Sequence, residues 1–281
     1  MNSWRSFGFI PELRLGDKVA LSAWKKAPLK HKPVIVNFCD LMTRRLLRNS
    51  SLRSLKRELK DSESLILSAV GADELLDELA VERIHDTALR LDADWVISPD
   101  DYIYEADTDY PFYQDSHFSR SIGRAIRLIT MARDQYGITG LAIGSCSDQL
   151  QAFVKTLEDY GIKDFAYACG DLFKQGKNPR RTILEIREFV NYLRSFNHSS
   201  LLLGIDSPKN LRLLTPDGWA CSAWSIEASH RRYYANDGTK RKGLRVVCHH
   251  DWCNSRRSKG IELLAVHNLL AQESLLTARR S

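Results

Sequence analysis

The chain has 281 residues, of which 43% are hydrophobic and 27% charged, values that are ordinary for a soluble globular protein. This length allows one large domain or two smaller ones. No apolar run approaches the roughly 20 residues of a membrane span, and the N-terminus lacks a secretory h-region, so we expect a cytoplasmic protein with no membrane partner. In that compartment the six cysteines are expected to be buried thiols or metal ligands rather than a disulfide framework.

Short apolar runs alternate along the chain with segments of helical periodicity. Near-continuous apolar runs with β-branched residues are typical of parallel strands buried on both faces. Such runs predict strands at 33–38, 65–70, 95–98, 140–145, 165–169, 201–205 and, more weakly, 221–225. The helical spacing between them gives four apolar faces: Leu76, Leu79, Ala80 and Ile84; Ile122, Ala125, Ile126 and Ile129; Phe153, Leu157 and Tyr160; and Ile183, Ile186, Val190 and Leu193.

Repeated strand–helix units imply a parallel sheet with right-handed crossovers. Seven strand candidates, with room for an eighth, favour a (β/α)8 barrel over an open doubly wound sheet. We expect a single domain over 1–281, with residues 229–270 as a C-terminal elaboration of it. Chemistry in such a barrel lies at the C-terminal ends of the strands. Those positions carry Asp40, Asp100, Asp101, Ser145, Cys146, Gly170, Asp171, Asp206, Trp224 and Ser225.

Positive charge gathers in one part of the chain. Residues 229–260 hold nine Lys and Arg residues against two acids, and the stretch "HRRYY" interleaves rings with the charges. Rings can stack on bases while cations meet phosphates, so this surface predicts a nucleic-acid partner. The contacts are expected from Arg231, Arg232, Lys240, Arg241, Lys242, Arg256 and Arg257. A second basic stretch, 43–60, is interpreted as a solvated helix face.

A metal-ligand pattern lies within the same C-terminal region. Cys248, His250 and Cys253 form C-x-H-x2-C, and His267 follows in a segment of helical periodicity. Thiolate and imidazole are the ligands that zinc prefers, and four protein ligands leave no open position for water. The pattern therefore predicts a structural Zn²⁺ site, with His249 outside the ligand set unless it exchanges with His250.

This motif resembles the zinc-binding end of the tRNA-guanine transglycosylase family, which carries C-x-C-x2-C followed by a helix containing "HN-L". The chain departs from it by a histidine at the middle position and by a shorter gap before His267. Further upstream, "ADWVISPDDYIY" is similar to the family strand that ends in an essential aspartate, matched by Asp100. "GLAIGSC", "YACGDL" and "LLLGIDSPKNL" resemble the family segments around the base pocket. The likeness covers about 90–272 and implies a (β/α)8 barrel with a zinc-bearing insertion.

The resemblance also implies which residues handle the base. It brings Gly144, Ser145 and Gly170 near the pocket, and Tyr102, Cys221 and Trp224 are further candidates for binding it. Asp101 is a candidate catalytic partner of Asp100. Neighbours in a strand point to opposite sides, however, so one of the two acids is expected to be structural.

The family's nucleophilic aspartate has no counterpart, because the aligned position is Ala220 or Cys221. Asp217 and Glu227 are the available substitutes, although Asp217 sits in a "PDG" turn pattern. Without a nucleophile, a carboxylate can still activate water or stabilise an oxocarbenium-like centre. We therefore expect a glycosylase with Asp100 as key carboxylate.

"CSAW" is closer to the family's DNA-acting relatives, which belong to DNA-modification and antiviral systems. This favours DNA over tRNA and release of a modified base in phage defence. Two alternatives stay open: a transglycosylase that inserts a 7-deazaguanine into DNA or tRNA, and a non-catalytic nucleic-acid-binding subunit. Family members often dimerise near the zinc region, which leaves a homodimer open.

Overall fold

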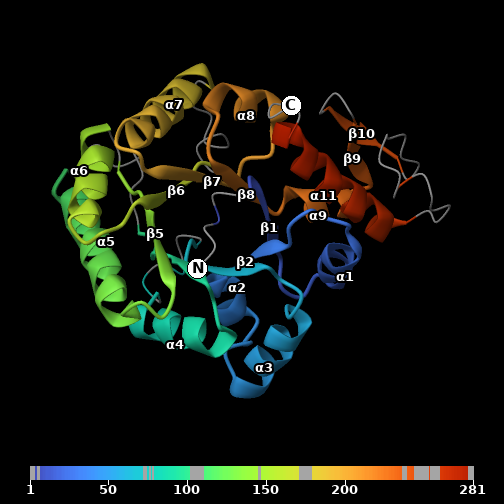
Figure 1. The fold of residues 1–281 in the computed structure, drawn as a ribbon, viewed down its shortest axis with the longest axis horizontal. Helices are drawn as coiled ribbons and strands as arrows, with labels where there is room; N and C mark the ends of the chain where they lie inside the picture. Colours follow the sequence, from blue (N-terminus) through green and yellow to red (C-terminus); the bar gives the residue numbers. More distant parts are fainter. Residues whose placement is uncertain are drawn as a thin grey trace.

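Eight parallel strands close into a barrel in chain order, and helices surround it, in a computed structural model of the chain (Figure 1). The structure describes residues 4, 7–71, 75, 77, 79–101, 111–144, 147–170, 179–235, 239–243, 253 and 260–277, without the side chains of 111–115, 179, 276 and 277. The (β/α)8 barrel predicted from the sequence is confirmed. Among the described residues, no helix has the length and apolar character needed to cross a membrane.

Strands and helices alternate along most of the barrel. The barrel strands are β1 Phe9–Leu13, β2 Pro33–Asn37, β3 Ser64–Ser68, β4 Trp95–Ile97, β5 Gly137–Leu141, β6 Asp164–Ala168, β7 Ser199–Leu203 and β8 Gly218–Cys221. The helices are α1 Lys18–Lys26, α2 Phe38–Thr43, α3 Asn49–Glu58, α4 Val81–Leu91, α5 Pro111–Ala132, α6 Ser147–Glu158, α7 Pro179–Ser195, α8 Pro208–Leu214, α9 Ala223–Ser229 and α11 Ile261–Thr277. Two short antiparallel strands outside the barrel, β9 Arg232–Tyr234 and β10 Lys240–Lys242, form a ribbon.

Each predicted strand overlaps a barrel strand, but β5 and β8 begin three residues earlier than expected, and β1 was missed. β5 starts at Gly137, where an added Cβ would lie 2.4 Å from the ring of Trp95, so this glycine packs inside the sheet rather than ending it. β8 ends at Cys221, because the chain turns there into α9. β1 escaped notice since Pro11 and Glu12 interrupt its apolar run.

The predicted helical faces hold with changes at their ends. α4 begins only at Val81, so Leu79 and Ala80 precede it, and Leu76 lies outside the described residues. Tyr160 follows α6 and is 49% exposed. The apolar periodicity that predicted these helices does not define the residues at which they begin and end.

The barrel interior is filled by one apolar layer to which every strand contributes one side chain. These side chains are Ile10, Ile35, Ile66, Ile97, Leu141, Ala166, Leu201 and Ala220. Below the layer the ring of Trp4 closes the barrel, and its Nε1 donates to Thr139 Oγ1 at 3.1 Å. The interior is therefore packed, and only its upper end is left for a site.

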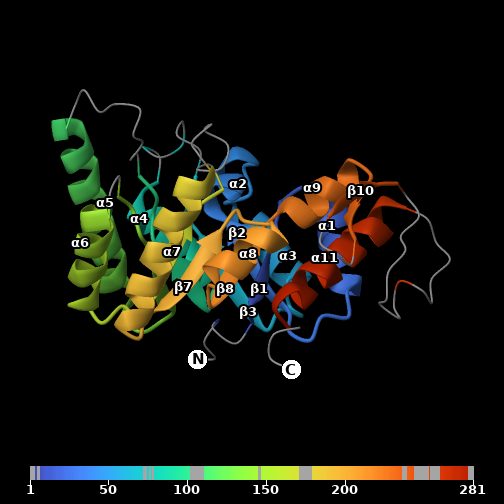
Figure 2. The same cartoon turned by 90° about the horizontal axis from the view of Figure 1, so that it is seen from above.

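The C-terminal helix α11 packs against α1 and α9 and holds the ribbon to the barrel (Figure 1). Asn268, which is completely buried, accepts from Tyr234 N and donates to the carbonyl oxygens of Trp224 and Arg232. One amide thus joins α11, α9 and β9, which is a structural reason for asparagine after His267. In Figure 2 the ribbon, α9 and α2 lie on one side of the barrel, the side on which β2 and β8 end.

Candidate active site at the barrel mouth

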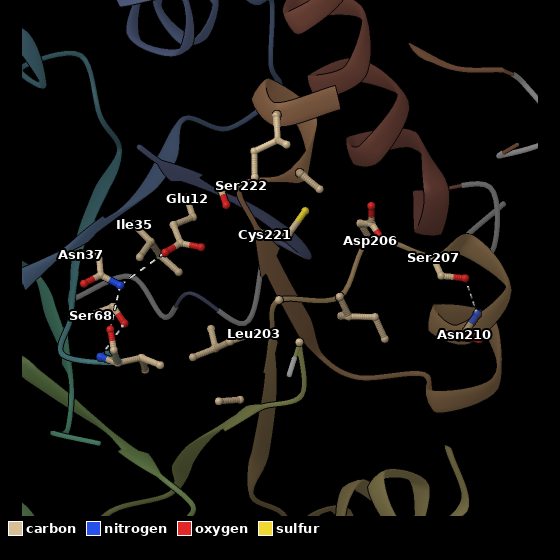
Figure 3. A pocket seen from close by; sticks show the side chains of 17 residues that line it. Glu12, Ile35, Asn37, Ser68, Leu203, Asp206, Ser207, Asn210, Cys221 and Ser222 are labelled. Atoms are coloured by element: carbon tan, nitrogen blue, oxygen red, sulfur yellow. Dashed lines mark hydrogen bonds between the residues drawn. The ribbon is translucent and has the colours of Figure 1, made fainter. Parts of the chain in front are cut away.

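A cavity of about 590 Å³ lies at the C-terminal ends of β1, β2, β3, β6, β7 and β8 (Figure 3). Side chains in a strand alternate between faces, so the residue two positions after each member of the apolar layer also points into the barrel. In six strands that residue lines the cavity: Glu12, Asn37, Ser68, Ala168, Leu203 and Ser222. The remaining lining comes from Ile35 of β2, from Cys221 of β8 and from residues that follow β3, β6, β7 and β8, including Gly170, Asp206, Ser207 and Asn210.

Glu12 is a carboxylic acid held in the wall of this cavity. Asn37 Nδ2 lies 3.5 Å from Glu12 Oε1 and donates to the carbonyl of Val70 at 2.9 Å. Burial raises the pKa of Glu12; the amide of Asn37 opposes the rise, the charge of Asp40 adds to it, and that of Arg14 again opposes it. The environment therefore favours a protonated Glu12, which can donate a proton.

Asp206 lies across the cavity, after the end of β7. Its Oδ2 accepts from the hydroxyl of Tyr234 at 2.7 Å and faces Lys240 Nζ at 2.8 Å. Burial and the charge of Asp206 raise the pKa of Tyr234, so the phenol keeps its proton and remains a donor. Lys240 also contacts Glu227 Oε1 at 3.0 Å, and these two acids outweigh burial and raise the pKa of Lys240. Asp206 is thus placed as an acceptor.

The adjacent acids Asp100 and Asp101 have different surroundings. Asp100 is half-buried just past the end of β4, and its two oxygens accept from Gly71 N at 3.4 Å and Asp101 N at 2.9 Å. The side chain of Asp101 has no exposed surface. It accepts from Arg120 through both oxygens and lies 2.9 Å from His117 Nδ1. These contacts favour Asp101 as the structural member of the pair, and it is not among the residues that line the cavity at the mouth.

The two substitutes for the family nucleophile lie elsewhere. Asp217 precedes β8, and its Oδ2 accepts from the N and Oγ of Ser200 at 2.9 Å, at the start of β7. It therefore belongs to the end of the barrel opposite the mouth, as its turn pattern indicated, and the structure does not bring it to Asp100. Glu227 lies in α9, where it is buried between Arg232 and Lys240.

The residues predicted to bind the base do not all lie at the cavity. Gly170 and Cys221 line the cavity, and burial strongly raises the pKa of the Cys221 thiol, so it is not a nucleophile at neutral pH. Gly144 packs against α6 instead, where an added Cβ would lie 2.9 Å from Leu150 N. Trp224 is completely buried in the core, so its ring offers no surface to a base. Tyr102 and Ser145 lie outside the described residues.

The basic ribbon borders the mouth through Lys240. Arg231, Arg241 and Lys242 are exposed, whereas Arg232 pairs with Glu227. Two of the cations predicted to bind nucleic acid, Arg232 and Lys240, are therefore partly neutralised by the protein's own acids. Arg256 and Arg257 lie outside the described residues.

A second basic surface was missed in the sequence. Three exposed arginines, Arg45, Arg48 and Arg83, line an open depression of about 480 Å³ beside α2, α3 and α4. α2 follows β2, so this depression lies towards the mouth side (Figure 2). The prediction that 43–60 is merely a solvated helix face overlooked Arg83, which folding brings from α4.

Two of the four predicted zinc ligands are described, and they lie together. Cys253 Sγ is 3.5 Å from His267 Nδ1, close to the roughly 3.6 Å between sulfur and nitrogen ligands of a tetrahedral zinc ion. His267 Nε2 lies 2.7 Å from the carbonyl oxygen of Tyr234, the contact that commonly orients a metal-binding imidazole. These residues fit the metal. Cys248 and His250 lie outside the described residues, among which no group of three ligands gathers.

Sequence reasoning missed Glu12 as a site residue because it missed β1. The alternation Ile10–Glu12, with the same spacing as Ile35–Asn37, was the available signal. Asp206 was noted only as one of many polar residues at strand ends.

Known proteins resemble this chain in fold only. No protein-family model matches it, and no curated protein matches it in sequence. Two crystal forms of N-acetylneuraminate lyase from Mycoplasma synoviae superpose with TM-scores of 0.50 and 0.51 at 12% and 11% identity. They cover 79% and 82% of this chain and 71% and 74% of the lyase chain. At this identity the likeness shows that the chain shares a (β/α)8 barrel with those lyases.

Proposed function

We propose that this protein is an enzyme that cleaves the N-glycosidic bond of a modified base in DNA and releases the base. The observation that carries the proposal is a cavity at the barrel mouth that holds two carboxyl groups and is bordered by a cationic ribbon. Acid–base carboxyl groups are what glycosidic cleavage requires, and cations beside them suit a phosphate backbone.

The size and position of the cavity support base flipping. A base inside a duplex cannot reach the bottom of a barrel mouth, so the nucleotide has to leave the stack. The cavity of about 590 Å³ lies within the range of small-molecule sites, roughly 300–1,000 Å³. The ribbon and the arginine depression both face the mouth side, where they can contact the strands flanking the flipped nucleotide.

Hydrolysis is favoured over base exchange by where the acids lie. Exchange needs a nucleophile that holds the sugar between two bases. Neither Asp217, at the opposite end of the barrel, nor Glu227, between two cations, is placed for that step. Asp100, the key carboxylate that the family resemblance implies, lies beyond the end of β4 and is not among the residues that line the cavity, so its role rests on the resemblance alone. DNA is preferred over tRNA on the similarity of "CSAW" to the DNA-acting relatives.

A structural zinc ion is part of the proposal. Cys253 and His267 would hold it together with Cys248 and His250, and its contribution would be to fix the ribbon and α11 rather than to take part in the reaction. Because the carbonyl of Tyr234 orients His267, the same metal would steady the donor to Asp206.

The proposal is tested by incubating the purified protein with modified phage DNA, unmodified DNA and bulk tRNA. Free bases and abasic sites are then measured by mass spectrometry. We expect free base from modified phage DNA without added base. Tight binding with no release from any of the three would indicate a binding subunit instead.

A further inference from the structure

We propose that Glu12 and Asp206 are the acid–base pair of the reaction, with Glu12 protonating the leaving base and Asp206 activating the attacking water. The inference rests on the proposed function and assigns its chemistry to Glu12, which lies outside the family resemblance, and to Asp206, to which the resemblance gives no catalytic role. It follows from where the two strands lie, from the partners of each carboxyl group, and from the cavity that they share.

The first argument is strand order. β8 pairs with β1 on one side and with β7 on the other, so Glu12 and Asp206 flank the end of β8. That end carries Ala220 and Cys221, the two positions that the resemblance aligns with the absent family nucleophile. In Figure 3, Cys221 and Ser222 lie between the two acids. The end of β8 is thus flanked by one carboxyl group on β1 and by another three residues after the end of β7.

The second argument is spacing. Strands β1 and β7 are separated by one strand, which places their backbones about 10 Å apart. Both side chains line the same cavity, one on each side of Cys221 and Ser222 (Figure 3). Carboxyl groups about 6.5–9.5 Å apart leave room for a water between acid and base, whereas a directly attacking carboxylate needs about 5–5.5 Å. The proposal places the two carboxyl groups at the wider of these separations, which suits hydrolysis by water.

The third argument is the set of partners. Both described contacts of the Asp206 carboxylate, from Tyr234 and Lys240, fall on Oδ2, and within the described residues Oδ1 has none. Glu12 likewise has one described partner, Asn37 at Oε1, and none at Oε2. Within the described residues each acid is therefore held through one oxygen, and the proposal assigns proton transfer to the other oxygen.

The reaction balances without any further reactant. The C1′–N bond breaks and its electron pair goes to the base, which takes the proton of Glu12. A water adds its oxygen to C1′ and gives a proton to Asp206. The products are the free base and a C1′ hydroxyl, and one proton then returns from Asp206 to Glu12 through solvent.

The test is single-turnover base release from modified phage DNA by wild type, Glu12→Gln and Asp206→Asn. We expect each variant to lose about 10²–10⁴-fold in rate. Asp92→Asn, which changes an exposed carboxylate in a left-handed helix cap that asparagine tolerates, is the matched control and should keep the wild-type rate.

The pH profile separates catalysis from structure. An acid must be protonated, so the wild-type rate should fall as pH rises through the elevated pKa of Glu12, and Glu12→Gln should remove that limb. The charged groups that act on Glu12 are Asp40 and Arg14, and the neutral amide of Asn37 contacts it. Circular dichroism checks that each variant is folded, and the loss in Glu12→Gln suffices if Asp206→Asn does not fold.

Two results would overturn the pair in distinguishable ways. In the first, wild type releases base and both folded variants keep rates within about threefold of the wild-type rate. General acid–base catalysis contributes more than that, so the assignment of the pair would be wrong while the proposed function stands. If wild type releases no base from modified phage DNA, unmodified DNA or tRNA, the proposed function fails and the pair falls with it.

Discussion

At the scale of single residues, Asp100 and Asp101 are adjacent in the chain, but their side chains lie in different surroundings. Asp101 turns into the space between the barrel and α5, where Arg120 and His117 surround it, while Asp100 caps the loop after β3. The sequence supports the expectation that one of the two is structural. It does not reveal which, because the side chains that surround Asp101 lie 16–23 positions further on.

Asp101→Asn should destabilise the fold without removing a reacting group. Breaking a buried ion pair costs about 3–5 kcal/mol, and the 36% exposure of the Arg120 side chain lowers the expected loss to about 2–3 kcal/mol. Chemical denaturation measures it. Asp77→Asn is the control, because Asp77 meets the same Arg120 but is 69% exposed, and it should change stability by less than about 1 kcal/mol. Equal effects of the two variants would contradict the assignment.

Glu12→Gln should be more stable than wild type at high pH, because it lacks the carboxyl group whose ionisation destabilises the wild-type fold. The folded state raises the pKa of Glu12 above its ordinary value of 4.5, so between these two pKa values the native state holds a proton that the unfolded chain has lost. Wild type therefore loses stability as pH rises through this window, and the variant does not. Denaturation at pH 4 and pH 8 should show a gain over wild type only at the higher pH. A variant that is less stable at pH 8 would indicate a charged, well-paired Glu12.

His267→Ala should cost both metal and folding. Metal binding at a structural site is coupled to folding, so the variant should lose about one zinc ion per chain, and its melting temperature should fall. Elemental analysis of the purified protein measures the metal. His230→Ala, an exposed histidine after α9, should keep it. Full zinc content in His267→Ala would contradict the ligand assignment.

At the scale of elements, periodicity predicted most strands but not where the chain departs from it. β1 was not predicted, because Pro11 and Glu12 interrupt its apolar run, and Glu12 is the residue of this strand that lines the cavity. Trp224 was expected at a strand end and lies buried in α9 instead, since β8 stops at Cys221. A strand's end depends on the neighbour with which it pairs, and a single sequence does not contain that register.

The ribbon β9–β10 is expected to bind phosphates of the DNA backbone. Arg241→Glu with Lys242→Glu should weaken DNA binding and flatten its salt dependence by about one unit of slope for each phosphate that the ribbon no longer neutralises. Fluorescence anisotropy over a salt series measures both. Arg57→Glu with Lys60→Glu makes the same change in net charge around the C-terminal end of α3, away from the mouth, and should leave the slope nearly unchanged. Equal reductions in affinity would show that total charge, rather than the ribbon, governs binding.

At the scale of the whole molecule, the closure of the barrel determines which acids line the same cavity. Glu12 and Asp206 are far apart in sequence, yet strand order brings both beside β8. Asp217 is closer to β8 in sequence and lies at the wrong end. The fold class follows from repeated strand–helix units, whereas the members of the site follow from closure of the sheet, which joins its first and last strands.

The most direct test of the account is the stoichiometry of release. Modified phage DNA is incubated with the protein and an excess of isotopically labelled 7-deazaguanine base, and free bases, abasic sites and labelled nucleotides are quantified by mass spectrometry. Hydrolysis at the barrel mouth predicts equal amounts of released base and abasic sites, with no label in the DNA. Label in the DNA without abasic sites would contradict hydrolysis and establish base exchange.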